Sequence, residues 1–266
     1  MNKVVKYDNY MNSLNFKYFT GMDFNFLMAL CNRLRNMDTA EIEISFKELK
    51  EITKYKRTSV VQFVSDLKRM NQKLMGITCN LETTSEILMF VLFPTFKINV
   101  EEQILTVSVN RDFKFILNEI TRNFTRFDLQ EFTELDSKYA KTMYRLLKQY
   151  RSTGLYTVSV EKFREIMDCP VCYTNKQFMQ CVVNPAVKNL QSCFRNLRCE
   201  TQYSHRRGNP VTGYAFTFTP EIPGNSEEGQ EDNKDGKYMK APDRYGSFHQ
   251  RSYDYDALEQ ELLRRS

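Results

Sequence analysis

Residues 44–52 read ISFKELKEI, and 114 residues further on residues 158–166 read VSVEKFREI. The apolar positions keep the same register in both stretches, and Ser, Glu and Ile recur at matching places. In each half a short turn, a second helical stretch and strand-like segments follow. The order helix, turn, helix, hairpin predicts a winged helix-turn-helix. We therefore expect an α+β fold with two winged-helix domains in tandem.

The length of 266 residues allows two domains of ordinary size, each with its own core. We place the first winged-helix domain at residues 1–118, the second at 119–222 and a disordered acidic tail at 223–266. The chain carries 38 basic and 33 acidic residues, but residues 221–266 hold 11 acidic and only 7 basic ones. The remaining body is therefore distinctly basic, which favours a polyanionic partner such as a nucleic acid.

Membrane and secretory signals are missing from the sequence. No stretch approaches the roughly 18 to 20 apolar residues of a membrane-spanning helix. The first residues, MNKVVKYD, lack the apolar core of a secretory signal. Seven cysteines, an odd number, fit a reducing cytoplasm better than a disulfide framework. We expect a cytoplasmic protein without membrane contact.

Hydrophobic periodicity predicts the main helices. They are expected at 24–34, 45–52, 57–74 and 137–150. Ser45 and Glu48 have the spacing of a capping box, and Gly76 is expected to end the third helix. In the fourth helix one face is apolar and the other basic. Its inward residues are expected to be Tyr139, Met143, Leu146, Leu147 and Tyr150, and its outward residues Lys138, Lys141, Arg145 and Lys148.

Alternating apolar residues predict the strands of both wings. The first wing is expected from 86–93 and 104–109, with a shorter run at 95–100, and the second from 198–203 and 214–219. Residues 113–120 are expected to bridge the halves. At the end of the chain, a short helix carrying Leu258, Leu262 and Leu263 could tether a host protein, or the tail could be idle.

The helix predicted at 57–74 has two distinct faces. One face is apolar and belongs to the core. The other carries side chains that hydrogen-bond base edges, since Gln suits adenine and Arg suits guanine. Cations at the start of the helix are placed to meet phosphates. The candidate DNA contacts of this unit are Lys54, Lys56, Arg57, Thr58, Gln62, Ser65 and Arg69. The alternative is an ordinary polar surface helix.

We call the DNA-recognition helix of each unit its reading helix, and that of the second unit is shorter. Phe178 and Val182 are expected to face inward and the polar residues around them outward. We expect Asn184 to cap a new helix and Pro185 to break or kink the old one. The candidate DNA contacts on this helix are Asn175, Lys176, Gln177 and Gln180.

The tip of the second wing carries Arg206 and Arg207, which complete the set of candidate DNA contacts. A basic hairpin there commonly touches the DNA backbone or minor groove, and the alternative is an ordinary exposed loop.

Catalytic and metal sites are not indicated. Cys169 and Cys172 make half of a zinc site, but the other cysteines offer no second close pair. The two histidines, His205 and His249, are not a close pair that could hold the metal of a nicking enzyme. The sequence also lacks the Gly-rich loop of P-loop ATPases. We expect a protein that is not an enzyme and has no cofactor.

Four stretches resemble plasmid replication initiators of the Rep_3 type. The most specific is SKYAKTMYRLLKQYRSTG at 137–154. Residues 163–190 resemble the family's second DNA-reading unit, 209–218 its closing wing and 4–36 its opening segment. The resemblance covers about residues 4–219. Cys181 departs from the family pattern, in which a basic residue is common.

The resemblance implies two winged-helix domains related by pseudo-twofold symmetry. It implies binding to directly repeated sites on double-stranded origin DNA and recruitment of a host initiator, helicase or clamp protein. It also implies a monomer–dimer equilibrium, in which the monomer initiates and a dimer formed through the first domain represses its own promoter. Matching positions would make Asn175, Lys176, Gln177 and Gln180 base or backbone contacts.

Two other functions remain open at this stage. A tandem winged-helix transcriptional repressor would show the same sequence features, and an inverted rather than a direct repeat in the adjacent DNA would favour it. A protein–protein scaffold whose winged helices never meet DNA would show no salt-dependent DNA binding.

Overall fold

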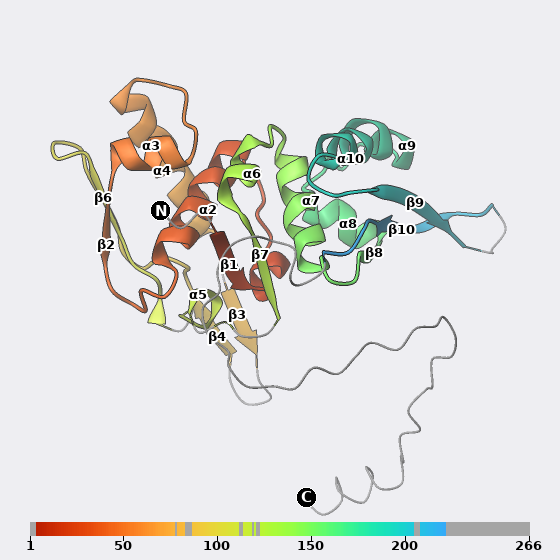
Figure 1. Cartoon of the computed structure of the whole chain (residues 1–266), viewed down its shortest axis with the longest axis horizontal. Helices are drawn as coiled ribbons and strands as arrows, with labels where there is room; N and C mark the ends of the chain where they lie inside the picture. Colours follow the sequence, from red (N-terminus) through yellow and green to blue (C-terminus); the bar gives the residue numbers. More distant parts are fainter. Residues whose placement is uncertain are drawn as a thin grey trace, which may run out of the picture. The chain divides into compact units, whose positions relative to one another are not determined.

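The structure, a computed structural model, describes residues 4–77, 79–82, 87–111, 114–118, 120, 123–204 and 208–221 (Figure 1). In chain order the elements are β1 (Val4–Asp8), α1 (Tyr10–Ser13), α2 (Gly21–Leu34), β2 (Ile42–Ser45), α3 (Phe46–Ile52), α4 (Val60–Met75), β3 (Cys79–Glu82), β4 (Ile87–Phe90), β5 (Phe96–Asn99), β6 (Ile104–Val107), α5 (Lys114–Leu117), β7 (Phe124–Asp128), α6 (Leu129–Glu134), α7 (Lys138–Gln149), β8 (Leu155–Ser159), α8 (Val160–Ile166), α9 (Asn175–Phe178), the π-helix η2 (Met179–Val183), α10 (Asn184–Leu190), β9 (Arg198–Tyr203) and β10 (Val211–Thr217).

The repeated stretch folds in the same way in both units. Ser45 caps α3 and Ser159 caps α8, and each hydroxyl accepts a hydrogen bond from the backbone N–H three residues further on. The capping box predicted in the first copy is only half formed, because the Glu48 carboxylate pairs with Arg33.

The equivalence continues into the turn that follows each helix. Lys54 and Asp168, again 114 residues apart, both adopt positive φ, 54° and 47°. The backbone N–H of the next residue donates to the carbonyl of Lys50 in the first unit and of Arg164 in the second, at 2.9 and 3.3 Å. The tandem prediction is confirmed down to the backbone conformation of the turn.

Each unit has its own three-stranded antiparallel sheet. The strand order is β2-β6-β5 in the first and β8-β10-β9 in the second, so the wing hairpins are β5–β6 and β9–β10. The second wing agrees with its prediction. In the first, the prediction was partly wrong, because β4 pairs with β3 in a separate hairpin and the short run at Phe96–Asn99 supplies the wing strand instead.

The centre of the molecule joins the two units. Helices α3 and α4 lie at one end in Figure 1 and α8, α9 and α10 at the other, with α2, α6, α7 and the β1–β7 pair between them. Strand β1 pairs with β7, so the first residues of the chain lie in one sheet with residues beyond 118. The buried apolar residues form one continuous core. The expectation of two separate cores was therefore wrong, while the domain limits at 118 and 222 stay a prediction.

Helix α7 corrects a second expectation. Lys141, Arg145 and Lys148, predicted to face outward, are buried, because α7 packs against α2 and β7 on one side and α10 and β8 on the other. The guanidinium of Arg145 lies over the rings of Phe16 and Phe24, 4.6 and 5.0 Å from their centroids. A basic face, which usually marks solvent, here fills the junction of the two units.

Capping residues set the starts of two helices three residues away from their predicted positions. Thr20 and Asp23 form a full capping box, so α2 begins at Gly21 instead of residue 24. Ser59 caps α4, so that Arg57 and Thr58 belong to the turn. Gly76 ends α4 as predicted.

Pro185 does not interrupt the second reading helix. The chain stays helical from Asn175 to Leu190, and residues 179–183 form a π-helical turn directly before the Asn184–Pro185 pair. A π turn shifts the hydrogen-bond register, which accommodates the missing proline N–H. Asn184 is itself helical (φ −62°, ψ −42°) and caps nothing, so that part of the prediction was wrong.

The predicted disordered tail and its terminal helix lie outside the described residues, as do Arg206 and Arg207. Among the helices that the structure describes, none is both long and apolar enough to cross a membrane.

Candidate DNA interface

The reading helix of the first unit, α4, presents one polar face. Phe63, Leu67, Met70 and Leu74 are buried, as predicted. On the other side Thr58, Ser65 and Arg69 are exposed and Gln62 is half-buried. Sequence reasoning missed two exposed neighbours on this face, Lys68 and Val61, the latter 81% exposed.

A buried carboxylate organises this face. Asp66 is 4% exposed and accepts hydrogen bonds from the Tyr55 hydroxyl (2.6 Å), Gln62 Nε2 (3.1 Å) and Arg69 NH2 (2.7 Å). Arg57 NH1 lies 3.6 Å from the same group. Burial alone would raise the pKa of Asp66, but the hydrogen bonds from Tyr55, Gln62 and Arg69 outweigh it and lower the pKa. We call Asp66 with these four partners the Asp66 cluster.

The cations before α4 differ in what they contact. Lys54 pairs with Glu134 of α6 at 2.7 Å, whereas Lys56 is exposed. The Arg57 side chain is also exposed, at 64%, and approaches Asp66. Of these predicted phosphate contacts, Lys56 and Arg57 therefore face outward, whereas Lys54 forms an ion pair with α6.

In each unit one further basic residue supports the turn, and sequence reasoning missed both of these residues. Lys50 Nζ lies 4.9 Å from the centroid of the Phe63 ring and donates to the Thr58 carbonyl at 3.4 Å. In the second unit the Arg164 guanidinium lies 5.2 Å from the Phe178 ring and donates to the Tyr173 carbonyl at 2.5 Å. The recurrence of a cation at this place in the repeat was the available signal.

The second reading helix exposes its predicted contacts. Asn175, Lys176, Gln177 and Gln180 are all exposed, while Phe178 and Val182 are buried as predicted. Gln177 also has a structural role, because it forms a capping box with Thr174. Asn184 and Lys188 continue the exposed polar face, and neither was among the candidate DNA contacts.

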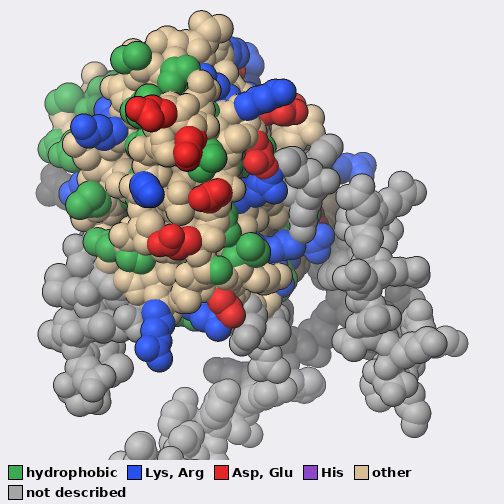
Figure 2. Space-filling view, turned by 90° about the vertical axis from the view of Figure 1, so that its left-hand side faces the viewer, with side chains coloured by type: hydrophobic (Ala, Val, Ile, Leu, Met, Phe, Trp, Pro, Cys, Tyr) green, Lys and Arg blue, Asp and Glu red, His purple; other side chains and the backbone are tan. Residues whose placement is uncertain are grey.

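The outer surface of the first unit mixes charges. Figure 2, which views the end of the molecule carrying β2 and β6, shows basic, acidic and apolar side chains interspersed among the described residues. The excess of basic residues is therefore not gathered on this face.

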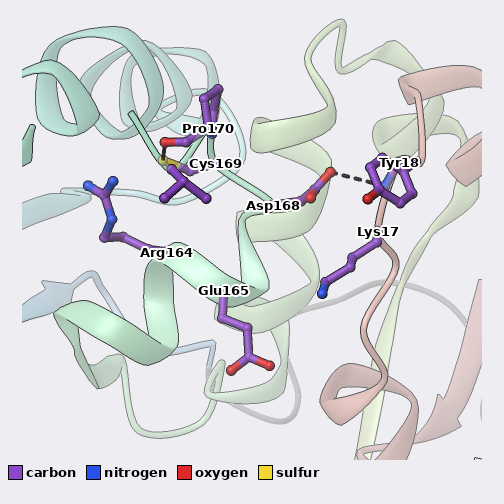
Figure 3. Close-up of a pocket in the computed structure, with 8 residues that line it drawn as sticks. Lys17, Tyr18, Arg164, Glu165, Asp168, Cys169 and Pro170 are labelled. Atoms are coloured by element: carbon purple, nitrogen blue, oxygen red, sulfur yellow. Dashed lines mark hydrogen bonds between the residues drawn. The ribbon is translucent and has the colours of Figure 1, made fainter. Parts of the chain in front are cut away.

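A cleft of about 570 Å³ lies where the two units meet. The backbone N–H of Tyr18 donates to Asp168 at 3.0 Å (Figure 3). Lys138 Nζ donates to the same carboxylate, also at 3.0 Å. Arg164 and Glu165 point in different directions in this view. Cys169 lines the cleft, and among the described residues no group of three or more metal-ligating side chains surrounds it.

The comparisons with known proteins agree on the family. Residues 4–148 match the description "Initiator Replication protein, WH1", and residues 159–218 match "Initiator Rep protein, WH2". A probable replication protein Rep of Bifidobacterium longum (strain NCC 2705) is 35% identical over 225 residues, covering 84% of this chain and 74% of that protein.

A solved structure shares the fold. The Pi initiator protein in complex with iteron DNA matches with a TM-score of 0.62 at 16% identity, covering 83% of this chain and 99% of that chain. With its two winged helix-turn-helix units and these matches, the chain belongs to the Rep_3 family of plasmid replication initiator proteins.

Proposed function

We propose that this initiator binds directly repeated sites at its replication origin by laying α4 and the α9–α10 helix into successive major grooves of one duplex. The observation that carries the proposal is the matched construction of the two units, each of which exposes a polar helix face behind an identically folded turn. The chain shares its fold with the Pi initiator, which was solved in complex with iteron DNA, and this likeness supports binding to DNA of that kind.

The candidate contacts divide by chemistry. Gln62, Arg69, Asn175 and Gln180 carry groups that pair with base edges. The shorter hydroxyls of Thr58 and Ser65 suit either bases or phosphates. The cations among the remaining candidates neutralise phosphates or, at the wing tip, reach the minor groove, and the uncharged amide of Gln177 donates a hydrogen bond to a phosphate. The cations are Lys54, Lys56, Arg57, Lys176, Arg206 and Arg207.

Beyond DNA, we propose that the chain acts in the cytoplasm, recruits host replication proteins and interconverts between monomer and dimer. Its contribution to initiation is binding and bending or melting of DNA, without catalysis of its own. The family to which it belongs supports this division of labour and disfavours a repressor without a role in replication. We propose the domain limits 1–118, 119–222 and 223–266, with the β1–β7 pair crossing the first of them.

A salt-titrated binding assay on the DNA flanking the gene tests the proposal. Arg69→Ala should weaken specific binding about 5- to 150-fold, since a good base contact contributes about 1–3 kcal/mol. Lys176→Ala should weaken binding to all DNA sequences alike, since it removes a phosphate contact. Each removes a cation, so the salt dependence should decrease by up to about one unit of slope. Lys162→Ala, at an exposed lysine paired with Glu165, is the matched control. Unchanged affinity in both variants would contradict the assignment of these helices to DNA.

A further inference from the structure

The two oxygens of Asp66 hold different parts of the reading unit. Oδ1 accepts from Gln62 and Arg69, the two α4 residues with base-reading chemistry. Oδ2 accepts from Tyr55 and faces Arg57, both of the turn before α4. One buried carboxylate therefore connects the turn to the reading face.

The hydrogen bonds to Asp66 leave the side chains of Gln62 and Arg69 able to contact DNA as well. The Arg69 side chain is 49% exposed, and its bond to Asp66 uses NH2 alone. A guanidinium carries five N–H donors in a rigid plane, so others remain for a base edge. Gln62 keeps its carbonyl oxygen and a second N–H while Nε2 is held.

Holding these side chains in advance lowers the entropy lost on binding. A Gln or Arg side chain that is fixed from full freedom loses up to about 2 kcal/mol. A side chain already fixed in its bound orientation loses less and discriminates better among bases, because it cannot reorient toward a wrong one.

Asp66 itself is too deeply buried to serve as a DNA contact. A buried carboxylate without partners would be costly, and an apolar residue would pack at this position more simply. The partners of Asp66 therefore indicate a role beyond filling the core. The caps of the two reading helices, Ser59 and Thr174, lie 115 residues apart, so the position that matches Asp66 in the second unit is Cys181, which is exposed. The arrangement around Asp66 is thus a feature of the first unit.

We propose that Asp66 is a positioning residue that sets the base preference of α4 by fixing Gln62 and Arg69 in their reading orientation. This inference rests on the proposed DNA binding by α4. It assigns to a buried residue a role in specificity, and it predicts that specificity can be lost while affinity for DNA in general is kept.

The test compares affinity for the flanking DNA site with affinity for unrelated duplex of equal length. Asp66→Asn should lower the ratio of the two affinities about tenfold, which corresponds to about 1.4 kcal/mol. Affinity for unrelated duplex should stay equal or rise, because a negative charge near phosphates is removed. Glu51→Gln, which removes an exposed carboxylate from α3, is the matched control and should leave the ratio unchanged.

Two further measurements separate positioning from a structural role. In an Arg69→Ala, Gln62→Ala background, Asp66→Asn should have little further effect on the ratio. Tyr55→Phe keeps the charge of Asp66 but removes the hydroxyl that donates to Oδ2, and it should lower the ratio about threefold. This variant takes the place of Asp66→Asn in the test if Asp66→Asn proves unfolded in a thermal melt. A parallel fall of specific and unrelated affinities in a folded variant, or an unchanged ratio, would overturn the inference.

The wild-type protein distinguishes this inference from the proposed function. If the wild type does not prefer the flanking site, DNA recognition itself fails. If the wild type prefers it and folded Asp66→Asn does so equally, only the role of Asp66 fails.

Discussion

Replacing Lys141 by Met should make the protein more stable at neutral pH and change how its stability depends on pH. Lys141 lies on α7 with only 1% of its surface exposed. Its ammonium donates to the Phe132 carbonyl at 2.7 Å and lies 4.7 Å from the Phe132 ring centroid. Burial lowers the pKa of Lys141 from 10.5 to about 7, against the opposing effect of Asp136.

The direction of the pH effect follows from proton binding. Because the pKa of Lys141 is lower in the folded than in the unfolded state, the unfolded chain binds the proton more tightly between about pH 7 and pH 10.5. Stability contributed through this residue therefore rises with pH in that window. The pKa shift of Lys141 adds about 2 kcal/mol to the free energy of unfolding as the pH rises from about 7 to about 9.

Urea unfolding of wild type and Lys141→Met across this pH range measures the effect. The wild type should gain about 2 kcal/mol relative to the variant as the pH rises from about 7 to about 9. Lys162→Met, at an exposed lysine, should follow the wild type. A constant difference between wild type and Lys141→Met over the whole range would refute the reasoning that the buried ammonium is desolvated.

Two further predictions concern the fold. Gly154→Ala should lower the free energy of unfolding by more than about 2 kcal/mol in the same assay, because residue 154 has φ +67° and a Cβ there would lie 2.3 Å from the Phe218 carbonyl oxygen. A loss below about 0.5 kcal/mol would contradict this. Arg145→Met should be at least as stable as wild type, since Nε and NH1 of this buried guanidinium have no hydrogen-bond partner among the described residues. Arg145→Ala should instead lose about 3 kcal/mol by leaving a cavity, and equal losses in the two variants would show that the charge is needed.

Local signals predicted the helix-turn-helix units well. The serine caps, the apolar register and the terminating Gly76 act within one or two turns of helix, so their effects are visible in sequence. Helix starts were displaced where caps outside the apolar pattern, such as Thr20 and Ser59, decided them.

Features that depend on the joining of distant segments were not predictable. Periodicity assigns a basic face to solvent, but α7 is covered on both sides, so Arg145 and Lys141 became buried. Similarly, Asp66 gives no signal of its own in the sequence, since its role depends on a turn residue and two helix residues meeting at one carboxylate. Strand pairing in the first half was misassigned because β4 has equally strong apolar character but finds its partner in β3.

The proposed function requires that the two matched units read neighbouring grooves of one duplex. Hydroxyl-radical footprinting of the wild type, Arg69→Ala and Lys176→Ala on the flanking DNA measures whether they do. We predict two protected segments on one face of the duplex, about one helical turn apart, with Arg69→Ala weakening one and Lys176→Ala the other. A single protected segment, or two segments that respond alike to both substitutions, would contradict it.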